Sequence, residues 1–315
     1  MCPTRRCCHT ARAECPGVTT RSWLPGYLAL AAIWGASFLF IGIGVRELHP
    51  VYVTLGRVVA GALALIVVLL LTRDRLPRDP VVWAHLCFTG LVGVVIPFTL
   101  FGYGEQRVSS GLAGIWNATT PLLTLPIAAL VMRTEKLTVR RAAGVGVGFL
   151  GVLVVLGVWQ GVGGAHLSGQ LMCLGAAACY GVAIPYQKKF LGHRPDSSGA
   201  LAAGQLITAT AQLLIVAPLL AGAPPSPLGL SPEVAASVLV LGVFGTGLAF
   251  LINMRNIRIM GASTASSVTY LIPVFAVLLG VLVLDEHISW HQPVGAVIVM
   301  LGVAISTISV RRPTP

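Results

Sequence analysis

Long apolar stretches separated by short polar turns make up almost the whole chain. Two stretches, from Ala142 to Gln187 and from Ser197 to Pro232, contain no Lys, Arg, Asp or Glu. A soluble domain cannot bury that much apolar sequence, and a helix that crosses a bilayer core needs about 20 predominantly apolar residues. The pattern therefore predicts an all-α membrane protein. Ten transmembrane helices are expected, at roughly 26–45, 51–71, 81–104, 109–131, 141–158, 168–187, 199–221, 233–254, 261–284 and 291–309.

The second half of the chain repeats the first. Gly90, Gly93 and Pro121 recur 152 positions later as Gly242, Gly245 and Pro273. Beyond the proline the offset is 151, and Glu135, Gly144, Gly151 and Val152 recur as Glu286, Gly295, Gly302 and Val303. An internal repeat of this length organises the whole fold. The predicted domains are two five-helix repeats, 26–158 and 168–309.

Each repeat has an odd number of predicted spans, so the two repeats must enter the membrane from opposite sides. The turn around Glu135 carries four basic residues, whereas its counterpart from Asp285 to Gln292 carries none. Cytoplasmic loops are enriched in Lys and Arg, so an inverted repeat predicts this contrast. Inverted repeats are typical of secondary transporters.

The distribution of Lys and Arg also predicts the orientation. With the N-terminus inside, the cytoplasmic segments hold 18 of these residues and the outer loops hold two, Arg46 and Arg107. Both termini are therefore expected in the cytoplasm, as a disordered tail over 1–25 and a short tail over 310–315. Translation could also begin at Val18 and omit most of the first tail. The net charge of +11 reflects this topology and some attraction to anionic lipid, and it requires no nucleic-acid partner.

Composition and motifs argue against an enzyme. The chain is 56% hydrophobic and 10% charged, with a mean hydropathy of +0.86, and no soluble domain fits between the spans. A phosphate-binding loop needs Gly-Lys-Ser/Thr, and no lysine here follows a glycine. His287 and His291 have helical spacing but no obvious third metal ligand beyond Glu286. We therefore expect no catalytic residue, no metal and no cofactor.

Arg57 is the most informative polar residue, because it lies about two turns into the second span. An arginine at the bilayer centre costs about 2.5–3.5 kcal/mol on insertion scales, so it usually snorkels, pairs or faces a wet cavity. The third span ends on the same side at Glu105, a candidate gate residue. Arg57 and Glu105 could pair and close the outer mouth. Alternatively, Arg57 could stay free to bind a substrate carboxylate through bidentate hydrogen bonds.

Other polar and aromatic residues inside the spans are further candidates for the wall of a cavity. The amides serve equally well as hydrogen-bonding partners between helices. Pro121 and Pro273 each free a backbone carbonyl in mid-helix, and such breaks cluster where transporters bind their substrates. The additional cavity candidates are Trp34, Asn117, Tyr180, Gln205 and Asn253.

A set of short motifs runs through both repeats. They are Ala-Ile-Trp34-Gly35-Ala-Ser, Gly56-Arg57, Pro121 with Glu135, Gly245-Thr-Gly-Leu-Ala-Phe250, and Pro273 through Gly280 to Glu286, Gly295 and Gly302. With their spacing and duplication, these motifs resemble the EamA-like family of the drug/metabolite transporter superfamily over 26–309. The resemblance implies a ten-helix carrier of the bacterial inner membrane, commonly an exporter of amino acids, metabolites or drugs. The halves differ. The second half has Tyr180-Gly181 where the first has Trp34-Gly35, and it has no arginine equivalent to Arg57.

The function expected from the sequence is secondary-active transport of a small amphipathic solute by alternating access, most often export. Import is the alternative within transport, and an intramembrane enzyme or a non-transporting scaffold is the alternative from another class. Proton coupling is left open. The glycine-rich fifth span of each repeat is expected to serve packing or dimerisation, so a homodimer is left open as well.

Overall fold

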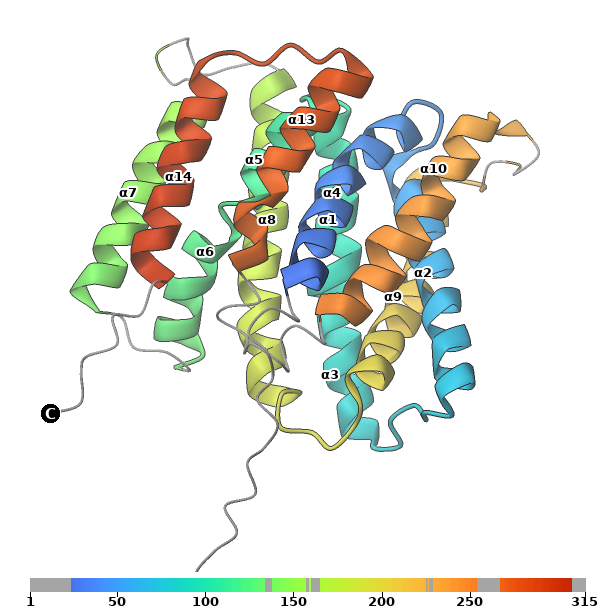
Figure 1. Cartoon of the computed structure of the whole chain (residues 1–315). Helices are drawn as coiled ribbons and strands as arrows, with labels where there is room; N and C mark the ends of the chain where they lie inside the picture. The colour runs from blue at the N-terminus through green and yellow to red at the C-terminus, as the bar shows by residue number, and fades with distance from the viewer. Residues whose placement is uncertain are drawn as a thin grey trace, which may run out of the picture.

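The computed structural model describes residues 24–133, 138–156, 159, 165–224, 226, 229–253 and 267–307. Within these ranges every secondary-structure element is helical (Figure 1). Residues 1–23, the C-terminal tail and the predicted turn at Glu135 lie outside the described ranges. The uninterrupted long helices are α1 (Leu24–Gly44), α2 (Pro50–Thr72), α7 (Val139–Leu156), α8 (Ala165–Phe190), α9 (Ser198–Ala221) and α14 (His291–Thr307).

The remaining helices are built from shorter pieces. The third predicted span consists of α3 (Pro80–Gly90), the π-helical η1 (Leu91–Val95) and α4 (Ile96–Glu105). The fourth consists of α5 (Ser110–Asn117), α6 (Thr120–Pro126) and η2 (Ile127–Val131). The eighth begins with α10 (Pro232–Gly242) and η5 (Val243–Leu248), and the ninth contains η6 (Ser267–Tyr270) and α13 (Ile272–Leu284). The π-helical turns η1 and η5 begin 152 residues apart, which is the repeat offset.

Helix ends follow recognisable local signals. Asp79, Ser109, Ser197 and Ser231 are N-cap residues, and each side-chain oxygen accepts a hydrogen bond from a backbone N–H two or three residues later. Such caps satisfy N–H groups that lack an intrahelical partner. In α3 and α10 a proline follows the cap directly, where its missing N–H costs nothing.

Eight helices of the described chain are long and apolar enough to cross a membrane, from Pro25–Gly44 to Pro232–Asn253, and two further apolar helices, Ile272–Leu284 and His291–Ile305, are shorter. Large apolar side chains such as Leu71 and Leu219 are each 79% exposed. A soluble surface does not tolerate so much exposed apolar area, whereas lipid does. The chain is therefore a multi-pass helical membrane protein, as its pattern predicts; the count of ten spans and their inversion stay predictions.

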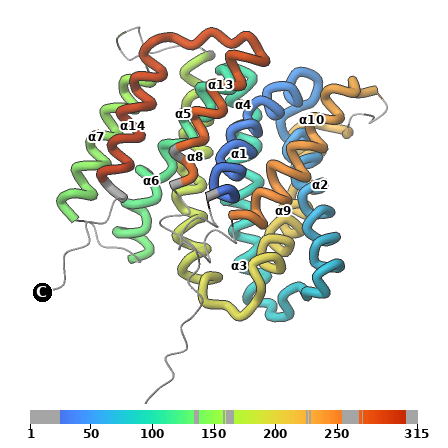
Figure 2. Tube along the Cα trace, in the orientation of Figure 1, coloured from blue at the N-terminus to red at the C-terminus, as the bar shows by residue number. Residues whose placement is uncertain are grey.

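Helices from the two halves of the sequence interleave. Helix α1 lies between α13 and α10, and α8 lies against α4 and α6 (Figure 2). Helix α2 packs along α9. Glycines allow several of these approaches: a Cβ placed on Gly35 of α1 would lie 3.2 Å from the backbone nitrogen of Ala276 in α13. A Cβ on Gly181 of α8 would lie 3.3 Å from the nitrogen of Thr124 in α6.

Helices α7 and α14, the fifth helices of the two halves, form a close pair at the edge of the molecule (Figure 1). A Cβ on Gly151 would lie 2.6 Å from the backbone nitrogen of Val299, and one on Gly295 would lie 2.6 Å from that of Val155. Gly302 abuts the backbone of Gly148 in the same way. Small residues of this kind let membrane helices approach closely. The glycines expected to serve packing or dimerisation are thus used for packing within one chain.

Candidate functional site

Arg57 lies in the interior of the bundle, 5% exposed. Its Nε donates to Thr246 Oγ1 at 2.7 Å, and its Nη2 donates to the carbonyl of Gly245 at 3.4 Å. The guanidinium also lies over the ring of Phe98, 3.7 Å from the ring centroid. Two of these residues belong to η5, where the wider π-helical turn disturbs the regular backbone ladder and makes a carbonyl available. Arg57 therefore joins α2 to the π-helical turn of the other half.

The direct pair between Arg57 and Glu105 that the sequence left open does not form in the described structure. Arg57 turns toward η5 and Phe98, whereas Glu105 Oε2 accepts a hydrogen bond from Ser110 Oγ at 2.9 Å. Glu105 ends α4, and Ser110 begins α5 five residues later, so a short turn brings hydroxyl and carboxylate together. No hydrogen bond or ion pair joins the two side chains in the described structure.

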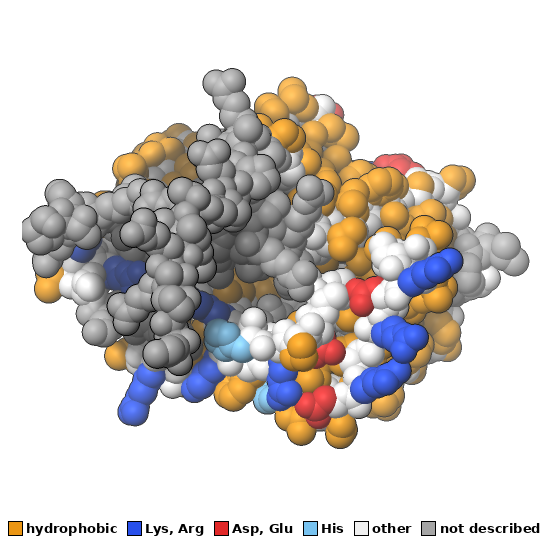
Figure 3. All heavy atoms as spheres, turned by 60° about the horizontal axis from the view of Figure 1, so that its bottom comes forward, with side chains coloured by type: hydrophobic (Ala, Val, Ile, Leu, Met, Phe, Trp, Pro, Cys, Tyr) orange, Lys and Arg blue, Asp and Glu red, His pale blue; other side chains and the backbone are white. Residues whose placement is uncertain are grey.

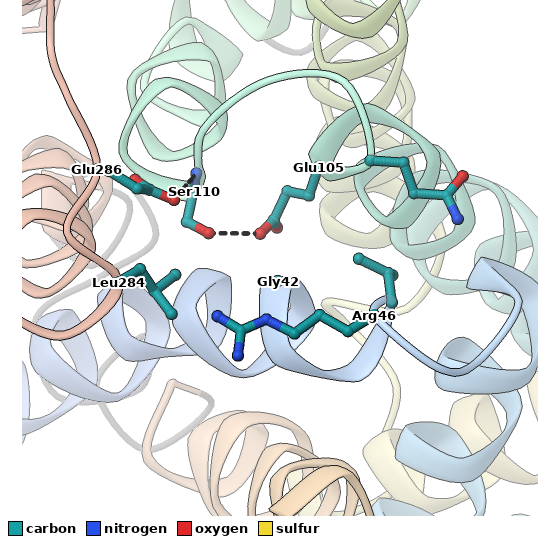
Figure 4. A pocket seen from close by; sticks show the side chains of 8 residues that line it. Gly42, Arg46, Glu105, Ser110, Leu284 and Glu286 are labelled. Carbon is teal, nitrogen blue, oxygen red and sulfur yellow. Dashed lines mark hydrogen bonds between the residues drawn. The ribbon is translucent and has the colours of Figure 1, made fainter.

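Glu105 lines a cavity of about 500 Å³ (Figure 4). Glu286, from the turn after α13, approaches from the other side and accepts hydrogen bonds from the backbone N–H groups of Ser110 and Gly111, at 2.7 and 3.0 Å. A carboxylate at the start of a helix is stabilised there by unpaired N–H groups and the helix dipole. Glu286 thus holds the first turn of α5 from the opposite half of the chain. The lining residues are Gly42, Val45, Arg46, Glu105, Gln106, Ser110, Leu284 and Glu286.

Asn117 lies at the break between α5 and α6, and it is 8% exposed. Pro121 cannot donate to the carbonyl of Asn117, and the Thr120 hydroxyl does so instead, at 2.7 Å. Thr119 Oγ1 donates to the carbonyl of Trp116, also at 2.7 Å. Carbonyls freed by a break inside a membrane helix need such replacement donors. The break predicted from Pro121 is therefore present, and two threonine hydroxyls stabilise it.

Tyr180 on α8 packs against the apolar cluster that contains Phe98, and its ring centroid is 6.2 Å from that of Phe101. Trp34 on α1 is half-buried and packs against two apolar clusters, one of which also contacts Tyr180. These two aromatic candidates and Arg57 come from α1, α8 and α2. None of the three lines the cavity beside Glu105, so their place in a cavity wall stays a prediction.

Gln205 and Asn253 have different surroundings. Gln205 on α9 is 3% exposed, donates to the carbonyl of Thr89 at 3.1 Å, and accepts from Gln187 Nε2 at 3.2 Å. It therefore bridges three helices. Asn253 is half-buried at the end of the helical run that follows η5, and no described hydrogen bond joins it to Arg57 or Glu105.

Two sets of polar contacts tie loops of the two halves together at opposite ends of the bundle. At one end, Arg194 Nη1 lies 2.9 Å from Asp79 Oδ2, and Ser197 donates to Asp74. Figure 3 shows the charged side chains gathered on this end, where α8 ends and α3 begins. A cavity of about 360 Å³ lies among these charged side chains.

At the other end, Arg46 and Glu233 lie 3.6 Å apart, and the N–H of Ser231 donates to Glu47 Oε2 at 3.0 Å. Hydrogen bonds from the Ser231 backbone and then its hydroxyl lower the pKa of Glu47. Asp79 is the N-cap residue of α3, and Ser231, one repeat offset later, is that of α10. The loops at the two ends of the bundle are therefore joined through equivalent N-cap residues of the two halves.

Sequence reasoning missed several members of this arrangement. Thr246, Phe98 and Ser110 are the direct partners of Arg57 and Glu105. Thr246 belongs to the motif Gly245-Thr-Gly-Leu-Ala-Phe250, and this motif could have indicated it as a site residue. No pattern in the sequence indicates Phe98 or Ser110, because their roles depend on contacts across helices.

The bundle consists of apolar helices that are interrupted at π-helical turns and prolines, and it buries an arginine. This architecture is typical of a membrane transporter rather than a soluble enzyme. The chain belongs to the EamA-like transporter family, whose model matches residues 21–157 and again 167–308. The family resemblance drawn from the motifs is thereby confirmed. Members of the family are named as transporters and not as enzymes.

Individual relatives agree with this assignment. The chain is 29% identical over 301 residues to the uncharacterized inner membrane transporter YedA of Escherichia coli, covering 91% of this chain and 92% of the relative. It is 24% identical over 294 residues to the uncharacterized transporter YoaV of Bacillus subtilis, covering 91% and 97%. A probable amino-acid metabolite efflux pump of Salmonella typhimurium is 24% identical over 306 residues, covering 91% and 95%. A solved crystal structure matches with a TM-score of 0.62 and 22% identity, covering 90% of this chain and 96% of that one, which shows a common fold.

Proposed function

We propose that the chain is a secondary-active carrier of the bacterial inner membrane that exports a small amphipathic solute by alternating access. Its ten helices would form two inverted five-helix repeats, with both termini in the cytoplasm. Transport would be driven by a proton or substrate gradient. The two separate matches to the family model support the duplication, and the bias of Lys and Arg supports the orientation.

The observation that carries this proposal is the exchange of equivalent contacts between the two halves. A Cβ on Gly242 would lie 2.7 Å from the carbonyl oxygen of Arg57, and one on Gly90 would lie 3.1 Å from that of Gln205. The two glycines are one repeat offset apart, and each precedes a π-helical turn. Pairs of equivalent positions that contact each other's half are what a pseudo-two-fold axis between the two repeats produces, and in inverted repeats this axis lies in the membrane plane.

A second pair of contacts has the same relation. A Cβ on Gly245 would lie 2.7 Å from Ser37 Oγ in α1, and one on Gly93 would lie 3.1 Å from the Cβ of Ala183 in α8. The contacts occur where the first helix of one half crosses the third helix of the other. Two inverted halves that meet at such interfaces can rock against each other about a central site, and neither half has to unfold.

The central site proposed here contains Arg57. Its guanidinium has five N–H donors, and described residues accept hydrogen bonds from two of its nitrogens, Nε and Nη2. It has no carboxylate partner in the described structure. A buried guanidinium is stabilised by a planar anion that accepts two parallel hydrogen bonds. We propose that the solute carries a carboxylate or similar acidic group and binds Arg57, with Tyr180, Trp34 and Asn117 forming the surrounding wall.

The experiment that tests the function is a resistance and efflux screen. The gene would be deleted and over-expressed, and cells would be challenged with amino acids, their toxic analogues and acidic metabolites. We expect over-expression to raise tolerance to one chemical class and to lower its intracellular level. Raised accumulation instead would establish import. The Salmonella relative, named as an amino-acid metabolite efflux pump, favours amino acids as the first compounds to test.

Vesicles then test the mechanism. Inverted membrane vesicles containing the chain should accumulate the identified solute when a gradient is imposed and should be indifferent to ATP. Transport that requires ATP after all gradients are collapsed would contradict secondary transport. A protein that moves no solute in either direction but alters one chemically would instead be an intramembrane enzyme, and one that does neither would be a scaffold.

A further inference from the structure

One buried carboxylate oxygen is left without a partner. Glu105 is 9% exposed, and its Oε2 is held by the Ser110 hydroxyl. Its Oε1 is buried and has no hydrogen-bond partner in the described structure. An ionised carboxylate loses far more solvation free energy on burial than one hydroxyl and the neighbouring Gly42 backbone return. Glu105 therefore requires either a proton or a cation for part of the working cycle.

The two arginines near Glu105 make no hydrogen bond to it in the described structure. Arg57, which faces it from α2, is bound to Thr246. Arg46, which lines the same cavity, lies 3.6 Å from Glu233. Neither arginine therefore bonds to Glu105.

The remaining titratable neighbours add no positive charge. Glu286, across the cavity, is a second negative charge that is itself satisfied by backbone N–H groups. Cys173, which faces Glu105 from α8, is buried and carries no compensating charge. Neither neighbour therefore supplies the proton or cation that a buried Glu105 carboxylate needs.

The surroundings of the carboxyl group decide between these two ligands. A metal ion needs several ligands in contact with it. A proton needs one carboxylate oxygen and a path for water to the carboxyl group. The adjoining cavity of about 500 Å³ gives that path, since it has room for several waters beside the carboxyl group. Among the described residues no group of three His, Cys, Asp or Glu side chains could hold a metal.

We infer that Glu105 is the site at which this carrier binds and releases the proton that drives it. This inference rests on the proposed secondary transport. A proton from water in the cavity adds to the Glu105 carboxylate and forms a neutral carboxylic acid. Its return to water on the other side, after the bundle has changed conformation, restores the carboxylate. Glu286 keeps its two hydrogen bonds from the backbone N–H groups of α5 and serves to hold that helix.

Infrared difference spectroscopy of the purified protein in lipid tests the inference without any transported solute. Each protonated Asp or Glu gives a carbonyl band, so Glu105 is identified by the component that its substitution removes. At successive pH values the wild-type spectrum minus that of Glu105→Gln should contain one such band, and this band should shift in heavy water. The component should remain in Glu233→Gln, the matched control, since Glu233 is an exposed carboxylate at the same end of the bundle. A difference spectrum without this band would overturn the assignment.

A transport measurement separates a proton site from a structural residue. Glu105→Gln mimics the protonated carboxyl group, so it should lose uphill, gradient-driven transport and keep the exchange of labelled for unlabelled solute. Loss of both activities in a variant that still has the wild-type Tm would contradict the inference, as would retention of both. If the wild type transports nothing while the infrared band titrates normally, the proposed function fails and the proton site stands.

Discussion

Arg57 and Gln205 occupy equivalent places in the two halves of the bundle. Arg57 is the eighth residue of α2, Gln205 is the eighth residue of α9, and the two helices pack together. Each residue presents its backbone carbonyl to the glycine that precedes a π-helical turn of the other half, Gly242 and Gly90 respectively. The position is the same, but only one half places a charge there.

The first prediction follows from this asymmetry. Arg57→Ala should abolish transport of an acidic solute and leave expression and membrane insertion intact. A hydrogen bond to a charged group contributes about 1.5–3 kcal/mol, so apparent affinity should fall roughly 10- to 150-fold. Arg57→Lys keeps the charge but loses the planar fork, and it should recover part of the activity. Solute binding to the purified variants gives the measurement.

Gln205→Ala is the matched control for Arg57→Ala. Gln205 bonds to Thr89 and Gln187 within the protein, so its loss should lower Tm and leave the preference for acidic solutes unchanged. Near-normal transport by Arg57→Ala would remove Arg57 from the site. Trp34, Asn117 and Tyr180 would then be the remaining candidates for binding.

The second prediction concerns the break at Pro121. Thr120→Val removes the hydroxyl that satisfies the carbonyl of Asn117, and a buried unsatisfied group costs about 1–3 kcal/mol. Unfolding of the purified protein should therefore begin at lower temperature. The double variant Thr120→Val, Pro121→Ala regains a backbone donor at position 121, so it should recover most of the lost stability. Equal destabilisation in the single and double variants would show that the hydroxyl does not have this role.

The sequence predicted the helical class, the family and the break at Pro121 because these depend on local patterns. Apolar runs of membrane length mark helices wherever they pack. Pro121 must free the carbonyl of Asn117 in any surrounding structure. The repeat offset can likewise be read directly from the sequence. The structure agrees with it, because η1 and η5 begin one offset apart.

The partners of the buried charges could not be predicted in this way. Arg57 bonds to Thr246, 189 residues away, and Ser110 bonds to Glu286, 176 residues away. Such contacts depend on which helices of the two halves cross, and one sequence contains no direct record of the crossings. The Arg57–Glu105 pair that the sequence left open is not made in the described structure for this reason. Depth in the membrane placed the two side chains near each other, but each bonds to a nearer hydroxyl.

The third prediction uses two glycines of the same helix. A Cβ on Gly151 of α7 would lie 2.6 Å from the backbone of Val299, whereas a Cβ on Gly146 would meet nothing within 4 Å. Gly151→Ala should therefore separate α7 from α14 and lower Tm. Gly146→Ala should be neutral or slightly stabilising, because alanine favours a helix over glycine by about 1 kcal/mol. Thermal unfolding in detergent measures both, and equal effects would contradict the close packing of this pair.

The last prediction concerns orientation. Ser226 and Arg75 are both exposed, and they lie in the loops at opposite ends of the bundle. The Arg75 loop also carries Arg73 and Arg78, whereas the Ser226 loop carries no charge. Cytoplasmic loops hold the excess of basic residues, so Ser226 should face the periplasm and Arg75 the cytoplasm.

Single cysteines at these positions make the prediction measurable. On a background without the native cysteines, Ser226→Cys should react with a membrane-impermeant thiol reagent in intact cells. Arg75→Cys should react only after the membrane is opened. Because both side chains are exposed, a difference in labelling reports the side of the membrane and not burial. The reverse result would invert the whole bundle, and the cavity beside Glu105 would then open toward the cytoplasm, so that the proton bound there would come from inside the cell.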